Sequence, residues 1–444
     1  MKDLAIVGAT VIDGTGSGPR KANVLIRDER IVSVDTQPPP AEAEVIDGAG
    51  KYVIPGLMDA NVHFIAPPPE RLLKDEGRYH EIALESAAVA LRAGLTSVFD
   101  TYGPLESLVK ARDRINGGGA VGSRMFIGGN IIGFAGPLSP DFFGSSPIIG
   151  SDTIGRINEA FEAGVGADLL WLPAEQVRER VRAYFDRGLV DLAKYGGSGH
   201  QQMDHILFSE RAQRVIVEEA HRAGLTAQAH TTTPESLRME IEAGADLLQH
   251  PDASGQHAIP DDLLEDIVQR QIPCACMVQT EGYLAWNESK GVPPMKWLHQ
   301  VKDVNDRRLI ESGAKILLTT DAYLTRPELQ FTVMAPMLLG AVDLLTELGE
   351  GHFLWLEAVI ERGMAPMDAL LAATRNIAEA YGKADELGTL EAGKRADLVI
   401  LDADPLADPR NYRRISDVFK DGSRVDRAAL PESPWAEVRI SSDA

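Results

Sequence analysis

The stretch from residue 53 to residue 64, VIPGLMDANVHF, constrains the fold of this chain more than any other. A short apolar run bounded by turn residues predicts a buried β-strand, and here a Pro-Gly pair breaks the run before polar side chains follow. Asn61 and His63 stand two positions apart, so both side chains point to the same face of an extended strand. The stretch therefore predicts a strand that ends in side chains able to hold a metal ion.

Between residues 58 and 375, helix-like segments alternate with short strand-like runs, which is typical of parallel β/α units. A helix, an Ala-Gly or Ser-Gly pair and a strand follow one another at 93–100, 223–230, 243–250 and 312–321. Each glycine stands where a helix C-cap is expected, so it marks the end of a helix and the start of a strand. Further strands are predicted at 125–129 and 190–195. We therefore expect an α/β fold with a (β/α)8 TIM-like barrel.

Polar side chains end several of these predicted strands. Lys194, His230, His250 and Asp321 each lie at or near the end of an apolar run. Barrel enzymes place their chemistry at the carboxyl ends of the strands, at one mouth of the barrel. We therefore expect these four residues to lie close to Asn61 and His63.

Both ends of the chain read as β-structure without helices. Short apolar runs separated by turns occupy residues 4–34, and a similar pattern returns at 396–402 and 415–422. Two half-sets of strands at opposite ends of a chain predict one small β-sandwich closed by both termini. The expected domains are residues 1–57 plus 376–444 for this sandwich and 58–375 for the barrel.

The composition is that of a globular protein, with 444 residues of which 44% are hydrophobic and 25% charged. A net charge of -22 repels nucleic acid and anionic membranes, so neither is an expected partner. The two cysteines, Cys274 and Cys276, provide no disulfide framework and are interpreted as small core residues. No apolar run is long enough for a membrane helix and the first residues are no signal peptide, so a cytoplasmic location is expected.

The strand-end residues have the chemistry of a hydrolytic metal site. Neutral imidazoles and carboxylates are preferred ligands of zinc, and the set His63, His230, His250 and Asp321 supplies both. A bound metal lowers the pKa of its water to about 7 and polarises the carbonyl under attack. Asp321 is the expected proton shuttle, and His250 is counted with it as catalytic. Five other single histidines are interpreted as structural: His80, His205, His221, His257 and His352.

The segment PGLMDANVH also resembles the Pro-Gly-Leu-Ile-Asp-x-His-x-His motif of the metal-dependent amidohydrolase superfamily, with Asn61 in place of the first histidine. This Asn-x-His variant resembles the branch of phenylurea hydrolases and molinate hydrolase, which cleave urea or thiocarbamate bonds of apolar compounds. Residues 387–398 resemble the segment with which the superfamily's chain returns to its β-domain.

The resemblance also bears on the ligand set. In the superfamily the lysine of the fourth strand is often carboxylated and bridges two metals, and Lys194 stands in the corresponding phrase. Because Asn61 replaces a good ligand, we expect one divalent ion per chain, zinc first, with cobalt and manganese as alternatives. Lys194 is either a carboxylated ligand or a nearby cation, and Asn61 is either a ligand or a hydrogen-bonding neighbour of the ligands.

The expected reaction is hydrolysis of the C–N or C–S bond of a neutral, largely apolar amide, urea or (thio)carbamate, such as a phenylurea herbicide. Loop aromatics such as Phe134, Phe142 and Tyr283 favour such a small-molecule substrate. Tyr195, His200 and His299 are candidate substrate-binding residues.

One alternative is a dipeptidase or N-acyl amino acid hydrolase, ochratoxin-type amides included, which needs a cation to bind the carboxylate of its substrate. The other is a non-catalytic scaffold. A homo-oligomer is expected.

Overall fold

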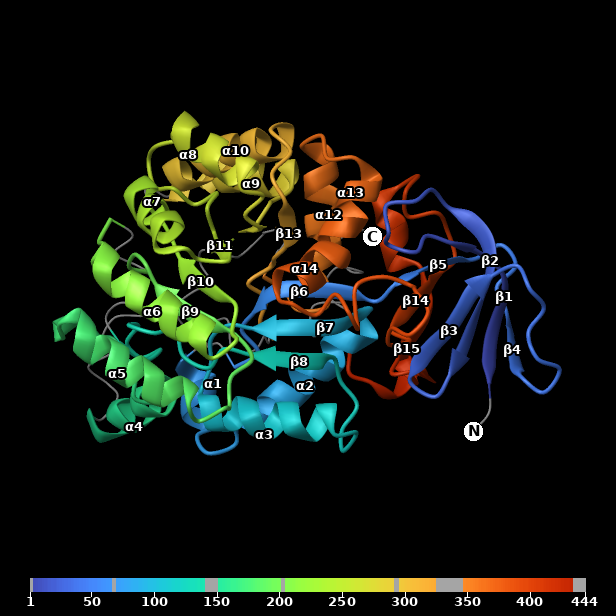
Figure 1. The fold of residues 1–444 in the computed structure, drawn as a ribbon, viewed down its shortest axis with the longest axis horizontal. Coiled ribbons are helices and arrows are strands. Elements are labelled where there is room, and N and C mark those ends of the chain that lie inside the picture. Colours follow the sequence, from blue (N-terminus) through green and yellow to red (C-terminus); the bar gives the residue numbers. More distant parts are fainter. Residues whose placement is uncertain are drawn as a thin grey trace.

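The computed structural model describes residues 3–65, 69–139, 151–200, 204–290, 295–324 and 346–433. For residues 69–70, 151, 286–290 and 295–299 it describes the backbone alone. Figure 1 shows the two parts of the molecule: a β-sheet at one end, and a larger body of strands and surrounding helices.

The sheet at the end of the molecule is built from both ends of the chain. Its strands are β1 (Leu4–Val11), β2 (Arg20–Arg27), β3 (Arg30–Asp35), β4 (Glu44–Asp47), β5 (Tyr52–Pro55), β14 (Leu398–Leu401), β15 (Ile415–Lys420) and β16 (Ser423–Arg424). They follow the order β16-β15-β14-β5-β1-β2-β3, and β4 pairs with β1. The antiparallel pair of β5 and β14 joins the two halves, whose apolar side chains form one core that includes Ile6, Val24, Leu398 and Phe419. The exact domain boundaries stay a prediction.

In the described residues, the body of the molecule contains eight parallel strands in two sheets. They are β6 (Leu57–Val62), β7 (Leu95–Asp100), β8 (Arg124–Ile127), β9 (Ala193–Gly196), β10 (Ala227–His230), β11 (Leu247–Gln249), β12 (Cys274–Cys276) and β13 (Ile316–Leu318). One sheet runs β6-β7-β8 and the other β13-β12-β11-β10-β9. Single parallel bridges, Val62 to Ala322 and Ile132 to Tyr195, connect the sheets at both edges. The strands therefore form the predicted barrel.

Helices follow the barrel strands. They are α1 (Pro69–Lys74), α2 (Tyr79–Arg92), α3 (Leu105–Asn116), α4 (Ser151–Glu162), α5 (Ala174–Phe185), α6 (Glu210–Arg222), α7 (Pro234–Ala243), α8 (Asp261–Gln269), α9 (Glu281–Lys290), α10 (Met295–Glu311), α12 (Gly351–Glu361), α13 (Pro366–Ala372) and α14 (Arg375–Ala380). The glycines predicted to end four helices, Gly94, Gly224, Gly244 and Gly313, all have positive φ, as a left-handed helix cap requires. The predicted strand at 190–195 is shorter in the structure, since β9 begins at Ala193.

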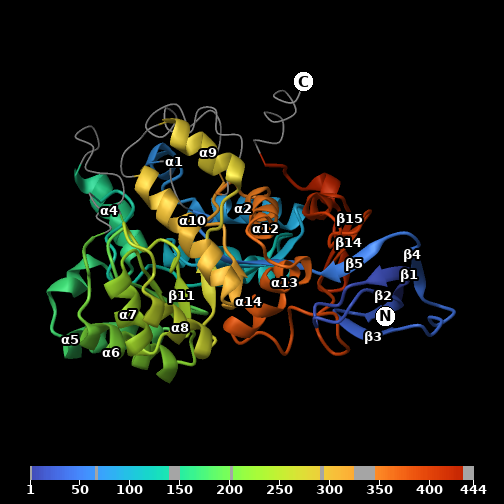
Figure 2. The same cartoon turned by 90° about the horizontal axis from the view of Figure 1, so that it is seen from above.

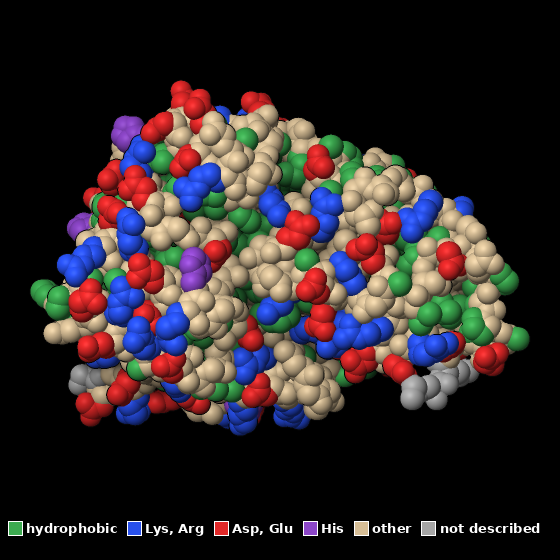
Figure 3. All heavy atoms as spheres, in the orientation of Figure 1, with side chains coloured by type: hydrophobic (Ala, Val, Ile, Leu, Met, Phe, Trp, Pro, Cys, Tyr) green, Lys and Arg blue, Asp and Glu red, His purple; other side chains and the backbone are tan. Residues whose placement is uncertain are grey.

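Acidic and basic side chains are interspersed over the face shown in Figure 3. Among the described residues, no helix has the length and apolar character needed to cross a membrane.

A buried carboxylate joins helices α5 and α6. Glu219 on α6 is 2% exposed at its side chain and accepts hydrogen bonds from Arg178, Arg182 and Arg222. The hydrogen bond from Arg182 is the main cause that lowers the pKa of Glu219 to about 2. The folded pKa thus lies below the value of about 4.3 in an unfolded chain. The stabilisation is complete above about pH 4.3 and is lost as the pH falls through the folded pKa.

We expect E219Q to lower the urea midpoint of unfolding at pH 7, and to lower it less at pH 3. The matched control is E218Q, because Glu218 is 51% exposed at its side chain and, in the described part of the chain, forms its ion pair with Arg178. An exposed ion pair contributes little, so the control should differ little from the wild type. Equal effects of the two substitutions, or an E219Q effect that does not change with pH, would contradict this assignment.

Candidate metal centre at the barrel mouth

The side chains predicted to meet at the carboxyl ends of the strands do meet there, with Asp321 in the middle. Its Oδ1 lies 3.1 Å from Nε2 of His63 and 3.7 Å from Nε2 of His250, and it accepts a hydrogen bond from the amide of Asn61. The ring of His230 lies 5.4 Å from that of His250, centroid to centroid. Residues at or shortly after the ends of strands β6, β10, β11 and β13 therefore form one cluster, which we call the mouth cluster.

Lys194 reaches the same cluster from β9. Its Nζ lies 2.9 Å from the hydroxyl of Thr101 and 3.4 Å from Oδ1 of Asn61, and Thr101 donates a hydrogen bond to that same oxygen. The lysine is 1% exposed, and burial lowers its pKa to about 8. Asn61 therefore faces two donors on its oxygen side and a carboxylate on its nitrogen side, and acts in this structure as a hydrogen-bonding residue.

The protonation states suit metal ligands. Burial is the main cause that lowers the pKa of His250 to about 4 and the pKa of His230 well below its usual value, so both rings are neutral at pH 7. Burial would raise the pKa of Asp321, but His63 and His250 outweigh it and hold the pKa well below its usual range. The cluster thus presents neutral imidazoles and an ionised carboxylate.

Two members of the mouth cluster have an unusual backbone. His250 has φ 60° and Asp321 has φ 58°, in the left-handed region where a side chain costs about 1–2 kcal/mol. His250 directly follows β11, and Asp321 lies shortly after the end of β13. Such strain persists where surrounding structure holds it, and it concentrates at functional sites.

The donor set fits a divalent ion. The Nε2 atoms of His63 and His250 face Asp321, and the buried Nε2 of His230 has no hydrogen-bond partner among the described residues. A buried polar atom without a partner is costly, whereas a metal would satisfy it. Imidazoles with a carboxylate are ligands that zinc, cobalt and manganese all accept.

A second group of side chains that could bind a metal is part of an ion-paired cluster. Ligand atoms of Asp252, Cys276 and Asp306 lie within 4.8 Å of one another. The ammonium of Lys302, however, contacts Asp252 and lies 3.1 Å from Asp306. Because this side chain already supplies the positive charge, the group is an ion-paired core cluster and not a metal site.

Sequence reasoning missed two residues that shape the mouth. Asp100 ends β7 and is fully buried; its carboxylate accepts hydrogen bonds from the backbone N–H of Phe64, at 3.0 Å, and of Tyr102, at 3.3 Å. It thereby fixes the turn that carries His63, and burial raises its pKa to about 8. Thr101 follows it. The available signal was the same as for Asp321, a carboxylate ending an apolar strand.

The predicted substrate-binding residues have different positions. The hydroxyl of Tyr195 donates to Gln213 on α6 at 3.2 Å and the residue is 0% exposed, so it packs between barrel and helix and not in the mouth. Neighbouring residues on a strand point to opposite faces, and Lys194 takes the inner one. The ring of His200 lies 5.8 Å from that of His230. The side chain of His299 and residue Phe142 lie outside the described residues.

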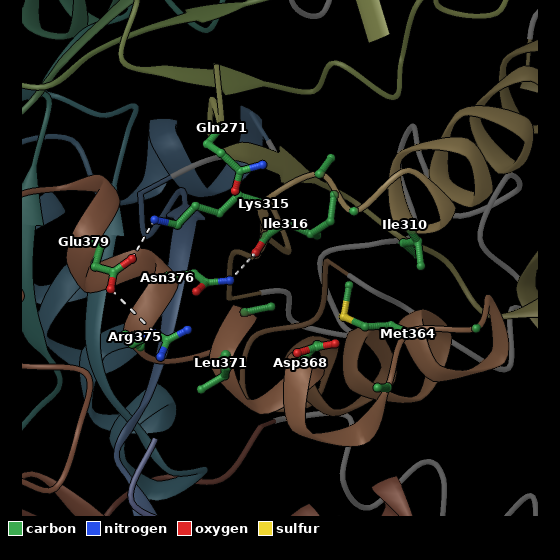
Figure 4. Close-up of a pocket in the computed structure, with 15 residues that line it drawn as sticks. Gln271, Ile310, Lys315, Ile316, Met364, Asp368, Leu371, Arg375, Asn376 and Glu379 are labelled. Carbon is green, nitrogen blue, oxygen red and sulfur yellow. Dashed lines mark hydrogen bonds and ion pairs between the residues drawn. The ribbon is translucent and has the colours of Figure 1, made fainter. Parts of the chain in front are cut away.

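A cavity of about 530 Å³ lies at the opposite end of the barrel (Figure 4). Lys315 and Ile316, at the start of β13, line it together with Arg375, Asn376 and Glu379 of α14. Two of its polar contacts are internal: Lys315 pairs with Glu379 at 2.6 Å, and Asn376 donates to the carbonyl of Ile316 at 3.3 Å. Since Asp321 lies beyond the other end of β13, this cavity is not part of the mouth.

The barrel, the terminal sheet and the mouth cluster together define a class of protein, which comparison with known proteins identifies. The sequence model of the amidohydrolase family matches residues 52–425, and the chain belongs to this family. The structure of molinate hydrolase matches with a TM-score of 0.91 and 37% identity, over 97% of this chain and 96% of that one. The crystal structure of phenylurea hydrolase B matches with a TM-score of 0.90 and 37% identity, over 98% and 99%. Ochratoxinase of Aspergillus niger is 24% identical over 98% of this chain and 89% of its own length.

These comparisons confirm the resemblance, the fold class and the enzymatic nature predicted from the sequence. The protein is a carbon–nitrogen hydrolase of the amidohydrolase family, whose members act on small molecules and generally bind divalent metal. The alternative of a non-catalytic scaffold is therefore set aside.

Proposed function

We propose that this enzyme uses one divalent metal ion per chain to hydrolyse the C–N or C–S bond of a neutral, largely apolar amide, urea or (thio)carbamate. The observation that carries the proposal is the mouth cluster, in which Nε2 of His63 and Nε2 of His250 face an ionised aspartate beside the ring of His230. The likeness to molinate hydrolase and phenylurea hydrolase B, at 37% identity each, supports the choice of substrate class.

His63, His230, His250 and Asp321 would hold the ion, with Lys194 and Asn61 completing its surroundings. Zinc is the first choice, and cobalt and manganese are the alternatives. When bound, the ion lowers the pKa of water to about 7 and polarises the carbonyl of the substrate.

Asp321 is the residue that moves the proton. Its carboxylate is ionised at neutral pH, so it can accept a proton from the attacking water and pass it to the leaving nitrogen or sulfur. The carbonyl carbon gains a bond to oxygen, and its bond to the leaving atom breaks. His63, 3.1 Å from Asp321, keeps the carboxylate oriented. His250 combines the roles of ligand and charge stabiliser.

The charges around the mouth favour an uncharged substrate. Lys194 is bonded to Thr101 and Asn61, and Arg71 donates to the carbonyl of Leu324 and pairs with Glu85. These cations are engaged within the protein, and each would have to break its own bonds to receive a substrate carboxylate. Aromatic rings lie against the histidines instead: Tyr102 against His63, at 5.8 Å, and Phe134 against His230, at 5.3 Å.

His200 is the proposed residue for polarising the substrate carbonyl, because it lies in the loop after β9 beside His230. The domain boundaries given above, a cytoplasmic location and assembly into a homo-oligomer are also part of this proposal.

The test is a metal analysis after dialysis joined with a hydrolysis screen on phenylureas, thiocarbamates, neutral anilides and N-acyl amino acids. We expect about one tightly held equivalent per chain in the wild type and much less in H250A, with turnover of a neutral urea, thiocarbamate or anilide. Two equivalents per chain, or no metal and no turnover, would contradict the proposal. Turnover of N-acyl amino acids alone would favour the dipeptidase or ochratoxin-type alternative.

A further inference from the structure

We propose that Lys302 is a positioning residue for His250: helix α10 holds the loop after β11 and thereby sets the direction in which the imidazole faces the metal. The inference rests on the proposed function, because it assigns Lys302 a role in metal binding. It concerns a side chain that lies outside the mouth cluster.

The loop after β11 is bonded to one face of α10. Asp252, two residues after His250, is gripped twice: its carboxylate contacts Lys302, and its carbonyl accepts a hydrogen bond from Asn305 at 2.9 Å. Asn305 also donates to Ser254 at 2.6 Å and accepts from the backbone N–H of Ile259 at 2.9 Å. Lys302 and Asn305 are three residues apart and so lie on the same helical face. The helix therefore holds the loop at several points, beginning next to His250.

These contacts are fully buried. Asp252 and Asn305 are 0% exposed, and the side chain of Lys302 is 7% exposed. Burial alone would lower the pKa of Lys302, but Asp252 and Asp306 outweigh it and raise the pKa above its usual value. The ammonium is thus kept charged by two carboxylates, one on the loop and one on its own helix. A buried charge that loses its partner is strongly destabilised, so the contact with Asp252 resists opening.

The contacts of Lys302 and Asn305 with the loop matter because the backbone of His250 is strained. The residue has φ 60°, and its own backbone bonds are few: its N–H donates to the carbonyl of Ala275 at 3.0 Å, and its carbonyl accepts from Ala253 at 2.9 Å. A residue other than glycine in the left-handed region relaxes to another backbone conformation unless the residues on either side of it are held in place. The flank after His250 is held by Lys302 and Asn305. Without them, the loop can relax and turn the imidazole away from the cluster.

The lysine acts at a distance, from a helix that follows the neighbouring strand β12. In Figures 1 and 2 the long helix α10 lies beside α9, and in Figure 1 both lie above β11. Trp355 of α12 donates to the carbonyl of Cys276 at 2.7 Å and closes the same packed layer. Lys302 therefore belongs to a rigid layer behind the mouth, which is where residues that orient metal ligands are found.

The experiment measures Co²⁺ binding to the full-length, metal-depleted protein by its visible absorption, which reports the geometry of the ligands. We expect K302M to bind Co²⁺ about 10- to 100-fold more weakly than the wild type, with a changed absorption band. The matched control is D306N, which removes a carboxylate from the same buried cluster but leaves the contact between Lys302 and Asp252. It should keep the wild-type band and nearly the wild-type affinity.

A second variant covers the case in which K302M does not fold. N305L removes the neutral bonds of α10 to the loop without leaving a buried charge, and it should weaken Co²⁺ binding in the same direction. The inference is overturned if K302M, or N305L in its place, binds Co²⁺ as the wild type does, or if D306N weakens binding as much as K302M. Wild-type protein that takes up no Co²⁺ overturns the proposed function as well, which separates the two failures.

Discussion

Asn in place of Asp321 should lower kcat/KM by about 100- to 10,000-fold, which is the range that a general base contributes. The substitution keeps the shape of the side chain but removes the proton acceptor. It also removes the negative charge that lies 3.1 Å from His63 and 3.7 Å from His250. The measurement is steady-state hydrolysis of the best substrate from the screen, with the metal content of D321N determined on the same sample.

The metal content of D321N distinguishes two roles of Asp321, general base and metal ligand. If D321N keeps its metal but loses activity, Asp321 is the general base. If D321N loses its metal, Asp321 is a ligand whose removal abolishes both metal binding and activity. The control is D204N, because Asp204 also pairs with a histidine, His205, at 2.9 Å, but on the exposed surface. That variant should keep wild-type activity. A D321N enzyme within about tenfold of the wild type would contradict the assignment, since a lost general base costs more.

Replacing Lys194 by alanine should have a comparably large effect. The side chain is 1% exposed and links Thr101 with Asn61, so its removal leaves a buried gap beside the cluster. We expect metal affinity or activity to fall by about 10- to 100-fold or more, as for residues that hold or orient a metal. The control is K315A, because Lys315 pairs with Glu379 at the opposite end of β13.

Small molecules added to K194A separate the two roles left open for Lys194. Acetate can replace a carboxylated lysine as a metal ligand, whereas ethylamine can replace its ammonium but not a carboxylate. Recovery of metal binding with acetate therefore assigns the carboxylated form, and recovery with ethylamine assigns the cation. A K194A protein with wild-type metal content and activity would contradict both.

Much of the site could be predicted because strand ends have simple geometry. His230, His250 and Asp321 follow apolar runs that glycine caps delimit, and parallel strands bring such ends together. Tyr195 was placed wrongly, because it was chosen for its position in the chain and not for the face of β9 on which it lies. The same alternation that points Lys194 inward points Tyr195 toward α6.

Other parts could not be predicted because they depend on contacts between distant segments. The bonds from Thr101 to Asn61 and from Asp100 to Phe64 join neighbouring strands whose register the sequence does not state. Likewise, Lys302 and Asp252 read as ordinary surface charges until the fold buries them together. The left-handed conformation of His250 has no signal in the sequence, since glycine or asparagine would be expected there.

The pairing of β5 with β14 has a consequence for the order in which the protein assembles. Strand β5 emerges from the ribosome early, but its partner, Leu398–Leu401, is made only after every strand of the barrel. During synthesis the edge of β5 is therefore exposed, and an exposed strand edge is a template for wrong pairing. Strand β14, which is made after the barrel, thus covers the edge of β5, a strand made before the barrel.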